Sequence, residues 1–506
     1  MTPILLARRA STVSAMRLVS SRGFTGSANC HKNIGIGAAA RRTLTRRHCS
    51  TLSGDKLARP PPPPHPSSSA AATVVQHEAA AATAAAGRQS LTAKNGSSKA
   101  VAAWLFGTAG AVAVMVTVGG ITRMTKSGLS MTDWKVQGSL PPSTEAEWEA
   151  EFDRYKAFPE WQQRRSMTLD EFKHIFFWEY AHRMLGRALG LIYGVPLLYF
   201  GARGRIPPHI RGRVAALLAL GGGQGLVGWW MVKSGLEDRS ADLAAGKEIR
   251  VSPYRLAAHL ATAFATFSLL VHTGLQALDG PRSTSTSAAA ARKLLLDAGL
   301  LRHASRLGAA ATGVCAVAFV TAVSGAFVAG NDAGRCYNRF PKMTEDNWLP
   351  EEILALRPLW RNFFENSATV QADHRALALT TTAAALGMFW YARRGAAGGA
   401  LWAALPPTPR ATTSVTAGLV AAQASLGITT LLQCAPLPLA ASHQAGALTV
   451  LASSMWAAHS LRFARSPLSL PTPPPPPPPA GPVAPVAQTP TPSPTMVTAT
   501  TKSTGV

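Results

Sequence analysis

Eight long apolar stretches occupy the middle of the chain and restrict its fold more than any other feature. They lie at about residues 100–121, 175–200, 214–232, 256–278, 307–330, 368–390, 412–432 and 440–461. A helix crosses the hydrocarbon core of a bilayer with about 20 apolar residues and satisfies its own backbone hydrogen bonds there. The pattern therefore predicts an all-α integral membrane protein with eight transmembrane helices in the lipid bilayer.

Composition favours a membrane environment over nucleic acid, the other partner that a basic chain suggests. Of the 506 residues, 47% are hydrophobic and 15% are charged, and the formal net charge is +25. The basic residues gather at the N-terminus and in short loops, with no basic stripe interleaved with aromatic residues, so no nucleic-acid partner is predicted. The five cysteines show no C-x-x-C spacing, which indicates neither a zinc nor an iron–sulfur site.

The two ends of the chain differ from its apolar middle. Residues 1–55 are rich in Arg, Ser and Thr and contain no acid before Asp55, which predicts a mitochondrial transit peptide. A plastid is the second choice of organelle, and a basic disordered tail is the plain alternative. Residues 56–98 are rich in Pro, Ala and Ser and predict a disordered linker, and residues 462–506 predict a Pro-rich disordered tail.

The charge of the loops predicts how the chain is oriented. The loop after the second stretch carries four arginines and no acid: Arg203, Arg205, Arg211 and Arg213. The loops after the fourth and sixth stretches are also basic, whereas the other loops mix both signs. By the positive-inside rule, both termini and the three basic loops face the matrix. The expected location is therefore the mitochondrial inner membrane, crossed several times.

A histidine motif is duplicated along the bundle. The pattern Glu-x-x-His-Arg at residues 179–183 recurs as Gln-x-x-His-Arg at residues 371–375, in each case where an apolar stretch opens. Three further matches follow in order: Val118-Gly119-Gly120 with Val323-Ser324-Gly325, Gln224 to Gly228 with Gln423 to Gly427, and His259 with His443. Two pseudo-symmetric four-helix bundles are therefore expected, in residues 99–278 and 307–461, joined by a matrix loop at 279–306.

Four histidines, one on each even-numbered stretch, are the candidate metal ligands: His182, His259, His374 and His443. Each lies within about two turns of the outer end of its stretch. Two facing imidazoles per half suit the axial positions of a haem iron, whereas zinc would lack its third and fourth protein ligands. Pairing within each half and pairing across the halves both agree with the spacing. The candidate partners for haem propionates are Arg183, Arg187 and Arg375.

The two motif copies differ at one position that matters for chemistry. Glu179 can exchange a proton or stabilise a developing cation, whereas Gln371 does not titrate. This difference predicts that the N-terminal half carries out chemistry while the C-terminal half holds a redox cofactor. In the alternative interpretation, Glu179 only pairs with Arg183, and Arg183 only reaches toward the membrane surface.

Two other function classes remain as alternatives. One is a bis-haem b membrane cytochrome, linked to quinone, that transfers electrons without modifying haem. The placement of all four histidines toward one side counts against conduction across the membrane. The other is a transporter with its site between the repeats, which the absence of ionisable residues at mid-depth disfavours.

Several blocks of residues between about 100 and 461 resemble the haem A synthase family, in its mitochondrial and proteobacterial branch. These blocks include Gly119-Gly120-Ile121-Thr122-Arg123, Ser127-Gly128-Leu129-Ser130-Met131, Asp133-Trp134-Lys135, the Glu-Tyr-x-His-Arg block at 179–183, Tyr337-Asn338-Arg339-Phe340-Pro341-Lys342-Met343 and Ser442-His443-Gln444-Ala445-Gly446. No catalytic cysteine pair is expected in this branch, and the sequence leaves open whether Cys336 and Cys434 form a disulfide.

The resemblance implies an oxidoreductase that converts the C8 methyl group of haem O to a formyl group, giving haem A for cytochrome c oxidase. It implies that His182 and His259 bind the haem substrate, that His374 and His443 hold a haem b cofactor, and that Glu179 is catalytic. A ferredoxin-type electron donor is the expected redox partner. Contact with haem O synthase and self-association into a homo-oligomer are further partner hypotheses.

Overall fold

The computed structural model describes residues 98–237, 244, 246, 248–279, 297–465 and 505, all of them in the second of the two units of the chain, Val75–Val506. The predicted transit peptide at 1–55 lies outside the described residues, as do residues 56–97 of the predicted linker. Most of the predicted loop at 279–306 and most of the Pro-rich tail also lie outside them.

Long helices occupy all eight of the predicted apolar stretches. They are Ser98–Met124, α3 Leu169–Ala202, α4 Arg211–Leu236, α6 Pro253–Ala277, α8 Ala298–Gly330, α10 Ser367–Trp390, α12 Pro407–Leu432 and α13 Leu437–Ser460. No strand occurs within the described ranges. Among the described residues, 6 helices are long and apolar enough to cross a membrane, and α10 and α13 are not among them. Both carry polar residues around a candidate ligand histidine, which lower their mean hydropathy.

Helix α3 begins well before the apolar stretch that predicted it. Thr168 and Glu171 form a capping box, in which each side chain bonds the backbone N–H of the other, so the helix starts at Leu169. The additional residues bury Phe172, which packs together with Phe176 of the predicted stretch against the short helix α2 Glu145–Lys156. As a result, His182 lies in the fourth turn of α3, deeper in its helix than predicted.

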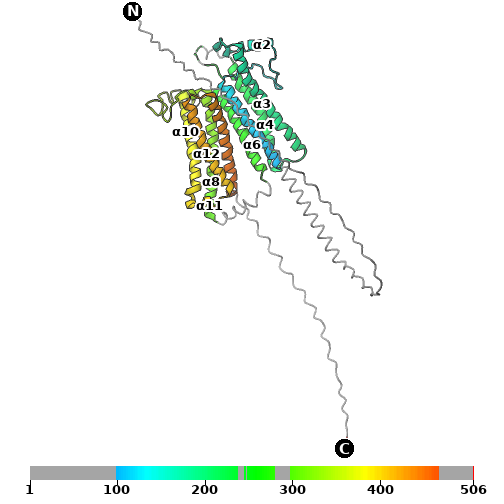
Figure 1. Cartoon of the computed structure of the whole chain (residues 1–506), viewed down its shortest axis with the longest axis vertical. Coiled ribbons are helices and arrows are strands. Elements are labelled where there is room, and N and C mark those ends of the chain that lie inside the picture. Colours follow the sequence, from blue (N-terminus) through cyan, green and yellow to red (C-terminus); the bar gives the residue numbers. More distant parts are fainter. Residues whose placement is uncertain are drawn as a thin grey trace, which may run out of the picture. The chain divides into compact units, whose positions relative to one another are not determined.

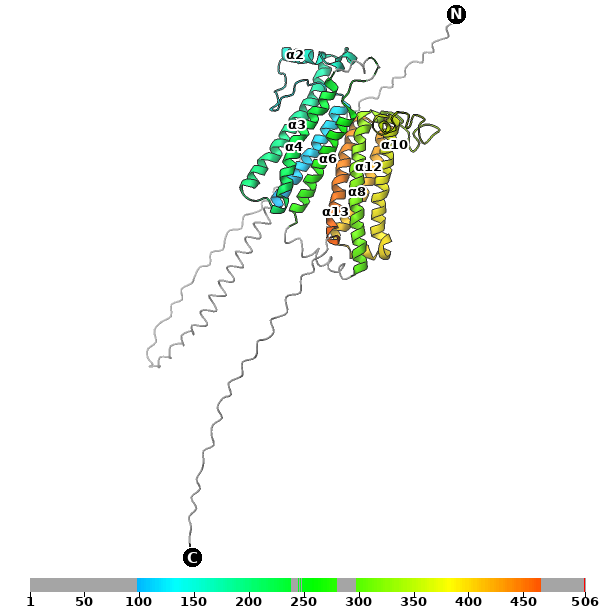
Figure 2. The same ribbon diagram turned by 180° about the vertical axis from the view of Figure 1, so that it is seen from behind.

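The eight long helices lie in two neighbouring groups. Helix Ser98–Met124 lies beside α3, α4 and α6, and α8 lies beside α10, α12 and α13 (Figures 1 and 2). Helices α6, α8 and α13 contact one another and form the junction between the groups. One cluster of buried apolar side chains spans this junction, and a second fills the C-terminal group.

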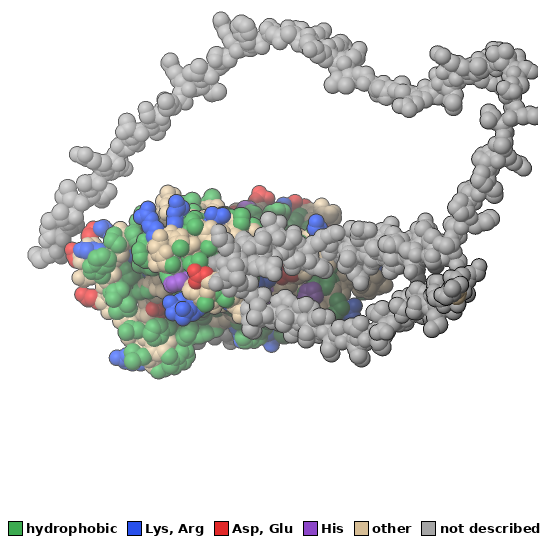
Figure 3. All heavy atoms as spheres, turned by 90° about the horizontal axis from the view of Figure 1, so that it is seen from below, with side chains coloured by type: hydrophobic (Ala, Val, Ile, Leu, Met, Phe, Trp, Pro, Cys, Tyr) green, Lys and Arg blue, Asp and Glu red, His purple; other side chains and the backbone are tan. Residues whose placement is uncertain are grey.

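Two segments outside the bundle lie at the same end of the helices. Residues 125–168 contain α2 and η1 Pro159–Gln163, and residues 331–366 contain η3 Ala333–Arg335, η4 Leu359–Arg361 and α9 Asn362–Glu365. We call this the histidine end, because α6, α10 and α13 begin here (Figures 1 and 2) and each carries its histidine about two turns from its start. The view from below in Figure 3 shows the opposite end, where basic side chains lie among hydrophobic ones.

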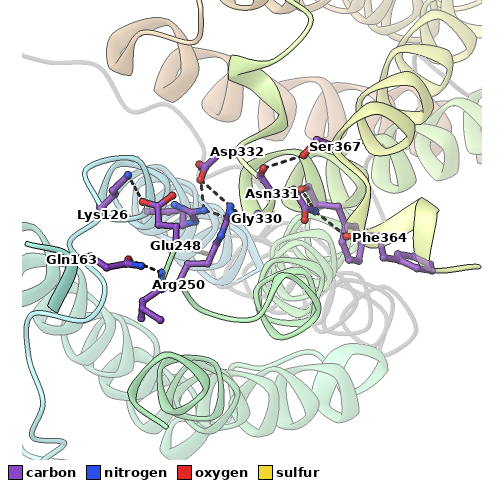
Figure 4. Close-up of polar contacts among 12 residues, drawn as sticks. Lys126, Gln163, Glu248, Arg250, Gly330, Asn331, Asp332, Phe364 and Ser367 are labelled. Atoms are coloured by element: carbon purple, nitrogen blue, oxygen red, sulfur yellow. Dashed lines mark hydrogen bonds and ion pairs between the residues drawn. The ribbon is translucent and has the colours of Figure 1, made fainter. Parts of the chain in front are cut away.

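Ion pairs join the two groups at the histidine end (Figure 4). Asp332, just after α8, accepts hydrogen bonds from Arg123 at 3.4 Å and Arg250 at 2.9 Å. Lys126 pairs with Glu248 alongside. Since Arg123 lies in the last turn of the helix Ser98–Met124 and Arg250 precedes α6, the Asp332 carboxylate links the segment after α8 to two elements of the first group.

Candidate functional site

Each candidate histidine faces a glycine on the preceding long helix. A Cβ atom added to the glycine would approach the imidazole Cε1 to 2.7 Å for Gly119–His182, 3.1 Å for Gly228–His259, 3.3 Å for Gly325–His374 and 2.7 Å for Gly427–His443. Carbon atoms in ordinary contact lie about 3.5–4.0 Å apart, so a side chain at these positions would displace the imidazole. The same helix-to-helix contact therefore occurs four times, once for each pair of helices.

These contacts show that one of the sequence matches between the two halves is out of register by one residue. The sequence match places Ser324 opposite Gly119, but the structure places Gly325 in the position equivalent to Gly119, against the imidazole. Val118 is therefore the counterpart of Ser324. The match of Gly228 with Gly427 needs no shift.

The structure brings the histidines together in pairs within each half. His182 and His259 lie close enough to interact electrostatically, and so do His374 and His443. In the part of the chain that the structure describes, no group of three or more His, Cys, Asp or Glu residues forms a metal site. Each half therefore offers two imidazoles, a number that suits the axial ligands of a haem iron better than a zinc ion.

Glu179 is buried and is fully engaged as a hydrogen-bond acceptor. Its Oε2 accepts from the Ser130 hydroxyl at 2.7 Å and from the backbone N–H of Met131 at 2.8 Å. Its Oε1 accepts from Arg183 at 2.6 Å. The carboxylate thus fixes the segment after the first helix onto α3, and the predicted alternative, an ion pair with Arg183, is present.

Gln371 fixes the equivalent segment of the second half, but with the opposite polarity. Its Nε2 donates to the backbone carbonyls of Ala333 at 2.7 Å and Cys336 at 2.6 Å. Its Oε1 accepts from Arg375 at 2.9 Å. The loop in the first half presents hydrogen-bond donors to the Glu179 carboxylate, whereas the loop in the second half presents carbonyl acceptors to the Gln371 amide. The sequence difference between Glu179 and Gln371 therefore matches a difference between the two loops.

Of the three arginines predicted to bind propionates, Arg375 retains unused donors. Arg183 donates to the carbonyls of Met131 and Asp133, and the N–H groups of Arg187 also bond backbone carbonyls. Arg375 donates from Nη2 to Tyr337 and Gln371, while its Nε and Nη1 are buried without a partner among the described residues. A carboxylate is the natural partner for two such N–H groups.

Arg123 is a second arginine with an unused buried donor, and no sequence pattern marked it as a candidate. Its Nη2 bonds Gly330 and Asp332, and its Nε has no partner within the described ranges. Its position one turn after Gly119 was the available signal, because that glycine faces a candidate ligand.

The sulfur atoms add no ligand to these pairs. Cys315, Cys336 and Cys434 are free thiols among the described residues, and Cys336 and Cys434 are exposed. The two imidazoles, the facing glycines and the unpaired donors of Arg375 together fit a haem in the C-terminal half.

Comparison with known proteins places these residues in a wider group. The family model described as "Cytochrome oxidase assembly protein" (COX15-CtaA) matches residues 102–455. The chain is 45% identical over 367 residues to "Heme A synthase COX15" of Arabidopsis thaliana, covering 72% of this chain and 75% of the relative. It is 42% identical over 383 residues to the Homo sapiens protein of the same name, covering 74% and 86%. It is also 42% identical to the "Heme A synthase-mitochondrial ferredoxin fusion protein" of Schizosaccharomyces pombe, covering 72% and 60%.

Proposed function

The chain belongs to the haem A synthase family, and from this premise we propose that it oxidises the C8 methyl group of haem O to the formyl group of haem A, for use in cytochrome c oxidase. The observation that carries the proposal is the repeated glycine–imidazole contact, which provides one two-histidine site in each half. One site serves the substrate and the other a resident cofactor.

We assign the substrate to the half that contains Glu179. His182 and His259 bind the iron of haem O there, while His374 and His443 hold a haem b in the other half. When bound, haem b supplies a one-electron redox centre. Arg375 supports this assignment, because its unpaired Nε and Nη1 are available to a propionate of the haem in its own half.

Glu179 is proposed to accept a proton released from the substrate. Its Oε2 becomes available if the Ser130 hydroxyl turns away, and that hydroxyl has a second acceptor, the Ser127 carbonyl, at 2.9 Å. Arg183 meanwhile keeps Oε1 in place. Proton uptake at Glu179 therefore requires the rotation of one hydroxyl group, and Gln371 in the other half has no such role.

The eight long helices are proposed to cross the mitochondrial inner membrane as two pseudo-symmetric four-helix bundles. Six of them are apolar enough by composition, and α10 and α13 take part in the same glycine–imidazole contacts as the others. The basic loop around Arg203 and Arg211 supports a matrix location for the end opposite the histidine end, and for both termini. A ferredoxin-type protein is the proposed electron donor, as the fused relative from Schizosaccharomyces pombe suggests.

The test is haem analysis of cells that supply haem O and express the wild type, Glu179→Gln, or Glu160→Gln. Glu160 is a matched control, because it is also a buried glutamate near the histidine end, but its ion pair is with Arg164 and not with a residue of the Glu-x-x-His-Arg motif. We expect haem A from the wild type and the control, and retained haem b without haem A from Glu179→Gln. If the wild type holds haem b but makes no haem A, the protein is an electron-transfer cytochrome instead. If Glu179→Gln loses its haems as well, the residue only fixes the loop.

A further inference from the structure

His374 differs from the other candidate ligands in the partner of its second ring nitrogen. Its Nδ1 lies 2.7 Å from the hydroxyl oxygen of Ser324, on the preceding helix α8. The same hydroxyl donates to the backbone carbonyl of Thr321 at 2.8 Å. A hydroxyl has one hydrogen, so Ser324 accepts on the side that faces His374. The ring proton is therefore on Nδ1, and the lone pair on Nε2 is free to bind iron.

None of the other three imidazoles has an acceptor of this kind among the described residues. The Nδ1 atoms of His182 and His259 are buried and have no partner. The Nδ1 of His443 lies 3.0 Å from Nε2 of Gln423, an amide nitrogen that also donates to the His443 carbonyl at 2.7 Å. The atom that faces Nδ1 of His443 is thus an amide nitrogen and not a hydroxyl oxygen, so the contact that Ser324 makes with His374 is not repeated there.

The repeat explains why the first half has no equivalent of Ser324. Because Gly119 and Gly325 occupy the same place against their imidazoles, the residue before each glycine is also equivalent. That residue is Ser324 in the second half and Val118 in the first, and valine offers no acceptor.

We propose that Ser324 is a positioning residue that fixes the ring orientation and the Nδ1–H form of His374, and so makes His374 the anchoring ligand of the resident haem. The inference rests on the proposed haem b site. An acceptor on Nδ1–H makes the imidazole a stronger electron donor, which stabilises ferric over ferrous iron and lowers the midpoint potential. The half without such an anchor is the one that must release its product, so the difference separates a retained haem from an exchanged one.

The first experiment compares Ser324→Ala with Ser324→Thr in the purified full-length protein, by potentiometric titration and by haem b retention. Loss of the acceptor in Ser324→Ala is expected to shift the ferric–ferrous equilibrium about tenfold toward ferrous, a rise of about 59 mV. Haem b retention is expected to fall about tenfold, the lower end for loss of such a partner. Ser324→Thr keeps the hydroxyl and restores both values, because Ser324 borders an apolar cavity of about 570 Å³ that can take the added methyl group.

Two further variants separate this inference from the function on which it rests. His374→Ala is expected to abolish haem b binding; if haem b is retained at its original potential, the site assignment fails. If His374→Ala loses haem b but Ser324→Ala keeps the wild-type potential, the site stands and the role of Ser324 is refuted. Val118→Ser is the reciprocal variant and is expected to slow release of haem from the first half. An unchanged release rate would refute the link between this acceptor and haem exchange.

Discussion

The contact between Gly427 and His443 allows a test of the haem b site by Gly427→Ala, a substitution that adds only a methyl group. A Cβ atom at position 427 would lie 2.7 Å from Cε1 of His443 and 3.4 Å from both ring nitrogens. The imidazole would have to move by roughly 1 Å to reach ordinary contact distance. Overpacking of this kind costs about 1–3 kcal/mol, and the better helix propensity of alanine offsets about 1 kcal/mol. The net cost falls on the ligand geometry and predicts about a tenfold loss of haem b affinity.

Two matched glycines make the prediction quantitative. Gly325→Ala acts on the partner ligand His374, but its added Cβ would lie at 3.3 Å, so a movement of a few tenths of an ångström suffices and a smaller loss is expected. Gly418→Ala lies on the same helix as Gly427 with nothing within 4 Å, so haem b should be retained in full. Haem b per purified protein, measured by absorbance, should therefore fall in the order Gly418→Ala, Gly325→Ala, Gly427→Ala. Full retention in Gly427→Ala would refute the placement of His443.

Three further predictions concern other contacts. Arg375→Gln should weaken haem b binding about tenfold or more, since a hydrogen bond to a charged group contributes about 1.5–3 kcal/mol. Arg187→Gln should leave haem b binding unchanged, because the donors of Arg187 already bond backbone carbonyls. Equal losses of haem b in a haem titration of the two variants would contradict this. In Gly120→Ala, the added methyl group would overlap the side-chain amide of Gln444, which bonds the Val116 carbonyl at 3.1 Å across the two halves. Loss of this hydrogen bond should lower the free energy of unfolding by about 1 kcal/mol in thermal unfolding, without loss of haem. Burial raises the pKa of Glu160 to about 7 despite its ion pair with Arg164. Between pH 4.5 and pH 7 the folded state therefore binds a proton that the unfolded state has already lost. About 3 kcal/mol of the free energy of unfolding is lost as the pH rises through this range. Proteolysis of residues 145–168 at pH 5.5 and pH 8 should show this loss in the wild type and not in Glu160→Gln.

The sequence predicted the features that depend on patterns within one segment. Long helices lie on all eight predicted apolar stretches, and 6 helices among the described residues are long and apolar enough to cross a membrane, because such a helix is specified by composition over a single run. The duplication was visible because His182 and His374 lie at one common offset from Glu179 and Gln371. The family was recognisable from the blocks around Gly119 and His443.

What the sequence did not predict depends on contacts between segments. The early start of α3 follows from the capping box at Thr168 and from packing of Phe172 on α2, which lies outside the apolar stretch. The acceptor role of Ser324 appears only when α8 and α10 are side by side, since no local pattern distinguishes it from other helical serines. The one-residue shift between Gly119 and Gly325 has the same origin, because helix rotation decides which of two neighbours faces the imidazole.

The opposite polarity of Glu179 and Gln371 has a consequence for how the two halves diverged from a common ancestor. A glutamate at 371 would bring a carboxylate against the carbonyls of Ala333 and Cys336, and a glutamine at 179 would bring amide hydrogens against the donors that now bind Glu179. Each side chain therefore matches the backbone groups that it faces, donors at Glu179 and acceptors at Gln371. Exchanging the two residues would need compensating changes in both loops, so the two halves are not interchangeable at this position.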